Sequence, residues 1–198
     1  MENRIIIAAQ GLFLRYGIRS VTMEDIAKEL GISKKTIYQH FSDKDNLVSR
    51  VTDYMLSMEQ TKIEVIQKEA KNPIEEQVFN STMMREMLEN INPVLFFDIK
   101  KYHPKSWSKY LVFKKVILET VKRNLIKGIE QNLYRKEINV EVLSKLRVET
   151  VDLVFNEEYF PGKFYKILEV QLESLDHFMR GILTPAGLEQ YEKTRIAN

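Results

Sequence analysis

The chain of 198 residues contains no cysteine, which excludes disulfides and thiolate metal sites. This absence fits a reducing compartment, and we expect a cytoplasmic protein. No apolar run approaches the length of about 20 residues that a membrane-spanning helix needs. The first residues are apolar, but Gln10 and Arg15 interrupt them too early for a secretory signal. The sequence therefore predicts a protein without disulfides, membrane spans or a secretory leader.

Signatures of catalysis are also missing. The sequence contains no G-x-S-x-G, no G-x-x-x-x-G-K and no H-E-x-x-H. The histidines, His40, His103 and His177, are too scattered to indicate a shared metal site. The acidic residues have the spacings of solvated helix faces. We therefore predict that the chain is not an enzyme and needs no metal or cofactor.

The net charge of +2 is too small to indicate a nucleic-acid partner by itself. The charge is unevenly distributed, because residues 100–136 carry 11 basic and 2 acidic side chains. A second DNA contact and an anionic-ligand site are both open interpretations of this segment. Its lysines alternate with the apolar residues of an amphipathic helix, which favours a solvated helix face.

Two short helices are predicted between residues 22 and 44. In the first, Ile26 and Leu30 lie on one apolar face. Thr22 and Asp25 have the spacing of a capping box at its start. Gly31 ends it, because a sharp turn after a helix favours a residue that tolerates positive φ.

Ser33 can cap the second helix, which is predicted over residues 34–41 with Ile37 and Phe41 facing inward. A short helix with cations, a hydroxyl, an amide and an aromatic ring on its outer face suits the major groove of DNA. Spacing alone also allows a helical corner that touches no nucleic acid. The side chains left on the outer face are Lys34, Lys35, Thr36, Tyr38, Gln39 and His40.

Residues 5–48 resemble the N-terminal domain of the TetR family of transcriptional regulators, over about a quarter of the chain. The residues that carry the resemblance are Ala9, Phe13, Gly17, Thr22, Ile26, Ala27, Gly31, Ser33, Thr36, Tyr38, His40, Phe41, Lys44 and Leu47. The resemblance implies a DNA-binding regulator, commonly a homodimeric repressor that binds a palindromic operator and is released by a small-molecule effector.

The resemblance also implies which side chains contact double-stranded DNA. Tyr38 and Lys44 are expected at backbone phosphates, Lys34 and Lys35 at guanine or phosphate, and Gln39 at adenine. The full predicted set is Thr22, Ser33, Lys34, Lys35, Thr36, Tyr38, Gln39, His40 and Lys44. The alternative is a helical dimeric small-molecule-binding or adaptor protein without specific DNA binding. The presence of Thr36, Tyr38 and Lys44, which folding alone is not expected to require, argues against it.

The rest of the chain has helical periodicity, so the predicted fold is all-α. We expect a three-helix DNA-binding domain over residues 1–45 and a larger helical ligand-binding and dimerisation domain over residues 46–198. Ser42 and Asp45 have the spacing of a capping box at the start of a long connecting helix. The predicted helices are 2–16, 22–30, 34–41, 43–70, 73–90, 94–102, 105–131, 140–155 and 164–183, followed by a short polar tail.

The last two predicted helices, 140–155 and 164–183, are candidates for the homodimer interface. The second has the broadest apolar stripe of the chain, and the resemblance places a four-helix bundle here across a two-fold axis. Alternatively, both helices belong only to the core. In the first helix, the side chains expected to point inward are Leu143, Leu146, Leu153 and Val154.

A ligand pocket is predicted from methionine and aromatic residues at helical spacing. These residue types often line adaptable apolar sites, although residues at this spacing more often belong to an ordinary core. The sequence does not identify the effector. The predicted lining residues are Met83, Met84, Met87, Phe96, Phe97, Trp107, Tyr110 and Phe113.

Overall fold

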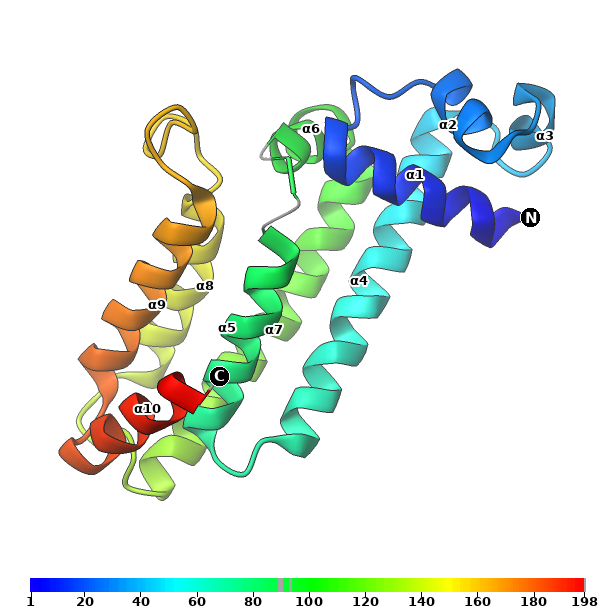
Figure 1. Cartoon of the computed structure of the whole chain (residues 1–198). Coiled ribbons are helices and arrows are strands. Elements are labelled where there is room, and N and C mark those ends of the chain that lie inside the picture. Colours follow the sequence, from blue (N-terminus) through cyan, green and yellow to red (C-terminus); the bar gives the residue numbers. More distant parts are fainter. Residues whose placement is uncertain (89–90, 93, 198) are drawn as a thin grey trace. The chain divides into compact units, whose positions relative to one another are not determined.

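The computed structural model describes residues 1–88, 91–92 and 94–197, and these form helices joined by short loops (Figure 1). In these residues the only strand-like pairing is an isolated bridge between Tyr134 and Leu183. The predicted all-α class is confirmed. The helices are α1 (Glu2–Tyr16), α2 (Met23–Leu30), α3 (Lys34–Tyr38), α4 (Lys44–Glu69), α5 (Pro73–Leu88), α6 (Val94–Tyr102), α7 (Pro104–Glu130), α8 (Val140–Leu153), α9 (Ile167–Ile182) and α10 (Pro185–Ala197).

The chain folds into two compact units. The first unit comprises Met1–Thr61 and Asn90–Phe113, and the second comprises Lys62–Glu89 and Lys114–Asn198. Helices α4 and α7 contribute residues to both units. The first unit contains α6 and the first part of α7 in addition to α1–α3 and most of α4. The DNA-binding domain over residues 1–45 remains a prediction.

The core of the first unit joins α1 to the two short helices that follow it. Phe13 of α1, Ile37 of α3 and Phe41 are at most 1% exposed. Burying a side chain of this size contributes roughly 1.5–3 kcal/mol. The same core contains Ile5, Ile6, Ala9, Ile18, Val21, Met23, Ile26, Ala27, Leu47, Val48, Val51 and Leu95. Helix α3 is thus fixed from beneath by its apolar side.

The cap of α4 differs from the predicted one. The side-chain Oδ1 of Asp43 accepts a hydrogen bond from the Asn46 backbone N–H at 2.7 Å, and the Ser42 hydroxyl donates to Asp43 Oδ2 at 3.0 Å. Asp43 is therefore the capping residue, and Ser42 supports it. These hydrogen bonds lower the pKa of the Asp43 carboxyl, the bond from Asn46 having the largest effect. The prediction failed because Ser42 and Asp43 both suit the N-cap position.

The core of the second unit is built around Tyr134, which is 1% exposed. Its hydroxyl donates to Asn124 Oδ1 at 3.1 Å. Its ring lies against Gly128 of α7, where an added Cβ would stand 2.0 Å from a ring carbon. Only glycine allows this close approach. Around it pack Ile74, Val78, Leu125, Leu175, Met179, Ile182, Leu183 and Tyr191.

The polar tail predicted after residue 183 is instead the helix α10. The Thr184 hydroxyl accepts a hydrogen bond from the Gly187 backbone N–H at 3.0 Å, and Pro185 is the first helical residue. Proline suits this position because its missing N–H would have no partner there. Pro73 and Pro104 begin α5 and α7 in the same way. The end predicted at residue 90 for the helix that starts at Pro73 lies outside the described residues.

Helix α8 faces the core with a different side from the predicted one. Leu146 is 55% exposed and Leu153 is 43% exposed, whereas Arg147 is buried. Val154 is buried and Leu143 half-buried, as predicted. Helix α9 follows the prediction, since its stripe buries Leu175, Met179 and Ile182. Within the part of the chain that the structure describes, none of the helices combines the length and apolar character that a membrane span requires.

Candidate DNA-binding site

Helix α2 begins and ends as the sequence predicts. The Thr22 Oγ1 accepts a hydrogen bond from the Asp25 backbone N–H at 3.1 Å, and Asp25 Oδ2 accepts from the Thr22 N–H at 2.8 Å. Hydrogen bonding to Thr22 lowers the pKa of the Asp25 carboxyl. Gly31 has φ 64° and ψ 33°, the left-handed conformation that ends the helix. This turn sets the direction in which α3 leaves α2.

Helix α3 is shorter than predicted. Ser33 Oγ accepts from the Thr36 backbone N–H at 3.1 Å and lies 2.9 Å from Thr36 Oγ1, so Ser33 caps the helix. The regular helix ends at Tyr38, and the chain continues to Phe41 in turns closed on the Ile37 carbonyl. The helix is therefore a single rigid turn, held at one end by its cap and from below by Ile37.

Most of the predicted contact residues are open to solvent. Tyr38 is 50% exposed, whereas tyrosine side chains in proteins are more often partly buried against neighbouring residues. Thr36 and Lys44 are half-buried. The remaining exposed members of the predicted set are Thr22, Ser33, Lys34, Lys35, Gln39 and His40. We call the exposed polar side chains of residues 33–40 the polar surface around α3.

Lys34 has a partner within the protein. Its Nζ lies 3.1 Å from the Glu24 carboxylate of α2, and both side chains are about half exposed. A phosphate or guanine that binds Lys34 must therefore compete with Glu24. Lys35, by contrast, has no ion pair among the described residues.

Lys44 has a structural partner that the sequence did not indicate. Its Nζ donates to the Ile18 carbonyl oxygen at 2.6 Å. Burial lowers the pKa of Lys44, an effect that Asp98, Asp45 and Asp25 oppose. Lys44 thus holds the α1–α2 loop, and the expectation that folding makes no use of it was wrong. Its contact with a DNA phosphate remains a prediction.

Helix α6 fixes the other side of the same loop. The buried Asp98 carboxylate accepts a hydrogen bond from the Arg19 backbone N–H at 3.0 Å, and the Arg19 guanidinium donates to the Tyr102 hydroxyl at 3.1 Å. Near the end of α1, the Asn92 backbone N–H donates to the Leu14 carbonyl at 2.7 Å. These partners lie about 80 residues apart along the chain, so no local pattern in the sequence reveals them.

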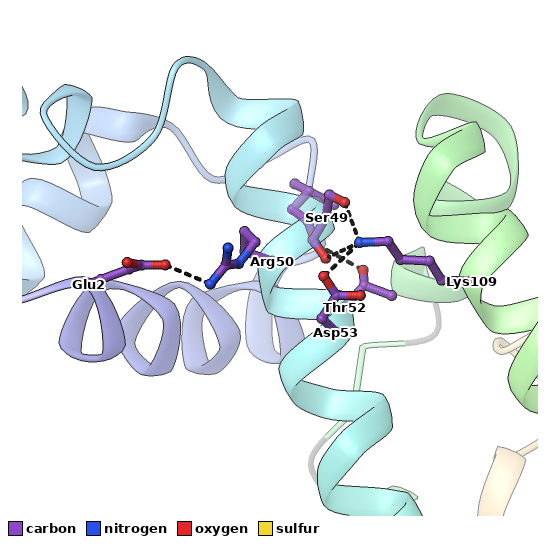
Figure 2. A network of polar contacts seen from close by, with 7 residues as sticks. Glu2, Ser49, Arg50, Thr52, Asp53 and Lys109 are labelled. Carbon is purple, nitrogen blue, oxygen red and sulfur yellow. Dashed lines mark hydrogen bonds and ion pairs between the residues drawn. The ribbon is translucent and has the colours of Figure 1, made fainter.

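Polar contacts also connect α4 to α1 and α7 within the first unit (Figure 2). Lys109 Nζ lies 2.6 Å from Ser49 Oγ and 2.7 Å from Asp53 Oδ2. On the other side of α4, Arg50 donates to the Glu2 carboxylate at 2.7 Å. The long helix that follows the helix-turn-helix is therefore held from two sides.

The arrangement is that of a helix-turn-helix, and the comparison with known families identifies it further. A family model described as bacterial regulatory proteins, tetR family, matches residues 5–51. The chain is a TetR-like DNA-binding regulator. The matched residues include the whole polar surface around α3.

Similarity to other transcriptional regulators extends beyond the matched segment. YvaF of Bacillus subtilis, an HTH-type transcriptional regulator, is 28% identical over 183 residues, covering 92% of this chain and 95% of the relative. A TetR-family regulator from Agrobacterium tumefaciens has a TM-score of 0.76 at 15% identity, over 92% of this chain and 97% of the other. A transcriptional regulator from Saccharomonospora viridis, in complex with choline, has a TM-score of 0.74 at 17% identity, over 92% and 97%. Both structural similarities concern the fold.

The predicted pocket residues fall into separate groups. In the first unit, the Phe96 ring lies 5.4 Å from Trp107 and 5.3 Å from Tyr110, both nearly perpendicular to it. Phe97 is 49% exposed and lies against Tyr102 instead. Phe113 is half-buried at the end of this unit. Met83, Met84 and Met87 are half-buried on α5 in the second unit. The ligand pocket remains a prediction.

The described residues contain no group of three or more histidine, aspartate or glutamate side chains placed to hold a metal ion. The basic segment 100–136 divides between solvated and paired lysines. Lys114 pairs with Glu149 and Asp152, and Lys122 with Glu119 and Glu141. Both lysines are therefore neutralised by carboxylates, and both connect α7 to α8 instead of forming a free anion-binding surface.

Proposed function

We propose that this TetR-like regulator is a cytoplasmic homodimeric repressor without catalytic activity, which binds a palindromic operator and releases it when a small molecule binds. The exposed polar surface around α3 is the observation that supports DNA binding. A single turn of helix contacts only a few base pairs. Useful specificity therefore requires two copies of α3, spaced about one DNA turn or a multiple of it apart.

The outer face of α8 supports the homodimer. Val142, Leu146 and Leu153 are 51%, 55% and 43% exposed, and their spacing of four and seven residues places them on one side of the helix. Such a stripe on a helix surface is typical of a partner interface. Of the two segments predicted for the interface, 140–155 thus offers the apolar surface, whereas α9 exposes Glu169, Glu173, His177 and Arg180.

Two observations support a small-molecule effector. The similar regulator from Saccharomonospora viridis is a complex with choline. In this chain, Phe96, Trp107 and Tyr110 form an aromatic cluster, with Lys100 Nζ 5.6 Å from the Trp107 ring. A ligand that binds the DNA-incompetent form more tightly must weaken DNA binding by its differential affinity.

Fluorescence anisotropy with DNA fragments from upstream of the gene tests the DNA-binding part. We expect tight, sequence-selective binding that weakens as salt rises. Tyr38→Ala should reduce the affinity, because it removes an exposed side chain of α3 that we expect to contact a backbone phosphate. Tyr159→Ala is the matched control, because Tyr159 is an exposed tyrosine of the second unit, at 58% compared with 50% for Tyr38. Binding no stronger than to random DNA at any salt concentration would instead favour an adaptor or small-molecule-binding protein.

Sedimentation equilibrium of Leu146→Glu tests the dimer. A charge in the centre of the apolar stripe should convert the dimer to a monomer at micromolar concentration and reduce operator binding. Lys145→Glu is the control, since Lys145 is exposed on the neighbouring side of α8. A Leu146→Glu variant that remains dimeric would place the interface elsewhere.

A further inference from the structure

Arg147 of α8 is a buried cation without a counter-charge. The residue is 7% exposed, and its Nη1 atom is buried without a hydrogen-bond partner. An arginine side chain has five N–H donors and no acceptor. Among the described residues, no carboxylate, carbonyl or hydroxyl accepts from this guanidinium. It lies in the second unit, where α8 and α9 run side by side (Figure 1).

The other buried charged groups show how unusual this is. Glu76 is 2% exposed and pairs with Arg123, and Asp98 is 1% exposed and accepts from Arg19. An uncompensated buried ion is strongly unfavourable, so buried charges in proteins are ordinarily paired. An acceptor from outside the described chain would remove this cost.

Two aromatic residues lie near Arg147. The Phe178 ring centroid lies 6.0 Å from the guanidinium carbon, and the buried Tyr191 interacts with the guanidinium electrostatically. Burial lowers the pKa of Arg147 to about 10, which leaves it protonated at neutral pH. A permanent positive charge therefore lies in the interior of the second unit.

A second unsatisfied polar atom lies on the facing helix. Gln171 is fully buried, and its Nε2 donates to the Val151 carbonyl at 2.9 Å, which fixes the amide. Its Oε1 has no partner in the described residues. Val151 follows Arg147 by four residues, so the two sites lie about 6 Å apart along α8. An unsatisfied donor and an unsatisfied acceptor thus occur within about one helical turn.

We propose that Arg147 binds the carboxylate of a small, otherwise apolar molecule enclosed between α8 and α9. The planar fork of a guanidinium matches the two oxygens of a carboxylate. A monoanion suits the site better than a phosphate dianion, because Arg147 is the only buried lysine or arginine among the described residues. Gln171 Oε1 accepts a hydrogen bond from a hydroxyl of the same molecule or from a water. We take this site in the second unit, and not the aromatic cluster of Phe96, Trp107 and Tyr110, as the effector site, so the effector would be a carboxylate. To this extent the inference rests on the proposed function.

Isothermal titration calorimetry of the full chain with sodium hexanoate, octanoate and decanoate tests this site. The probes 1-octanol and octylamine have matched apolar bodies without the negative charge. We expect at least one carboxylate to bind, and both octanol and octylamine to bind more weakly or not at all. Arg147→Met should weaken carboxylate binding about tenfold to a hundredfold, the contribution expected of hydrogen bonds to a charged group.

Two further variants separate the site from general effects of charge or folding. Arg147→Lys keeps the positive charge but lacks the planar guanidinium. It should bind octanoate with an affinity between those of the wild type and Arg147→Met. Arg180→Met removes an exposed arginine of α9 that is paired with Asp176 and Glu192, and it should bind octanoate like the wild type. Without ligand, Arg147→Met should melt at the wild-type temperature or above it, because it removes an unpaired buried charge.

The proposal is overturned if none of the three carboxylates binds, if octanol binds equally well, or if Arg147→Met binds them with wild-type affinity. It is also overturned if unliganded Arg147→Met melts far below the wild type, because Arg147 would then have a partner in the folded chain. Operator binding is measured separately for the wild type and for Arg147→Met. A carboxylate that binds through Arg147 without releasing DNA would refute effector release and leave this site intact. A different effector that releases DNA equally from the wild type and from Arg147→Met would support effector release and refute this site as the effector site.

Discussion

Asp98 in the first unit and Arg147 in the second are both almost completely buried, yet only Asp98 has a hydrogen-bonding partner among the described residues. The Asp98 carboxylate orders the loop between α1 and α2, next to the helix that we expect to enter the major groove. The buried Nη1 atom of Arg147 makes no hydrogen bond to any residue that the structure describes. A buried charge with hydrogen-bond partners stabilises one conformation of the chain. A buried charge without partners destabilises the unliganded protein, and a ligand that supplies the acceptor removes this penalty. The difference separates a positioning residue from a candidate binding residue.

The largest effect on stability is expected in the second unit, from Gly128→Ala. The new methyl group would overlap the Tyr134 ring, and the overpacking should lower the free energy of unfolding by about 3 kcal/mol. Gly11→Ala is the matched control in the first unit, because nothing lies within 4 Å of its added Cβ. That substitution should raise stability by about 0.5–1 kcal/mol. Urea denaturation measures both values, and equal effects would contradict the packing described for Tyr134.

A smaller loss is expected from Asp98→Ala. The Arg19 N–H would lose its acceptor, which should cost about 1–3 kcal/mol and loosen the α1–α2 loop. We expect weaker operator binding as well, because Lys44 holds the same loop from the other side. Thermal melting and anisotropy measure the two effects. Wild-type affinity in this variant would show that the loop does not influence α3.

Glu24→Gln should change DNA binding without lowering stability appreciably. Since Glu24 pairs with Lys34 at the surface, its removal leaves Lys34 free for DNA and removes a negative charge near the phosphates. Exposed ion pairs contribute about 0.2–1 kcal/mol, so the affinity should rise about twofold to fivefold. Lys34→Ala in the same assay should lower it. A Glu24→Gln variant that binds DNA more weakly would mean that Glu24 contacts a base.

The smallest effect is expected from the α2 cap under acidic conditions. The folded-state pKa of Asp25 lies below its ordinary value of 3.8. Its contribution to stability is therefore complete above pH 3.8 and is lost as the pH falls through the lower folded-state value. The melting temperature of Asp25→Asn should depend less on pH in this range than that of the wild type. Glu29→Gln, an exposed substitution on the same helix, is the control.

The features that the sequence predicts correctly are those whose partners lie close together along the chain. Thr22 bonds to Asp25 and Ser33 to Thr36, each three residues apart, and Gly31 acts within its own turn. Apolar periodicity was also sufficient to predict α1 and α9. These parts of the candidate site need no tertiary information.

The features that the sequence misses depend on distant segments. Asp98 acts on Arg19 across 79 residues, and the orientation of α8 depends on α7 and α9. Periodicity offered one signal for Arg147, since it follows the half-buried Leu143 by four residues and so occupies a core-facing position. The burial of Arg147 without an acceptor at Nη1 can therefore be recognised only in the folded second unit.

The depth of Arg147 also affects how fast the regulator can respond. A molecule cannot reach a guanidinium that is 7% exposed until part of the α8–α9 packing opens, so entry and exit follow the frequency of local opening. The association rate constant should consequently lie far below the diffusion limit. The dissociation rate constant should be reduced by the same factor. Slow dissociation would keep the regulator in its liganded form after the surrounding concentration has fallen. The liganded fraction of such a protein would depend on recent effector concentrations as well as on the present one.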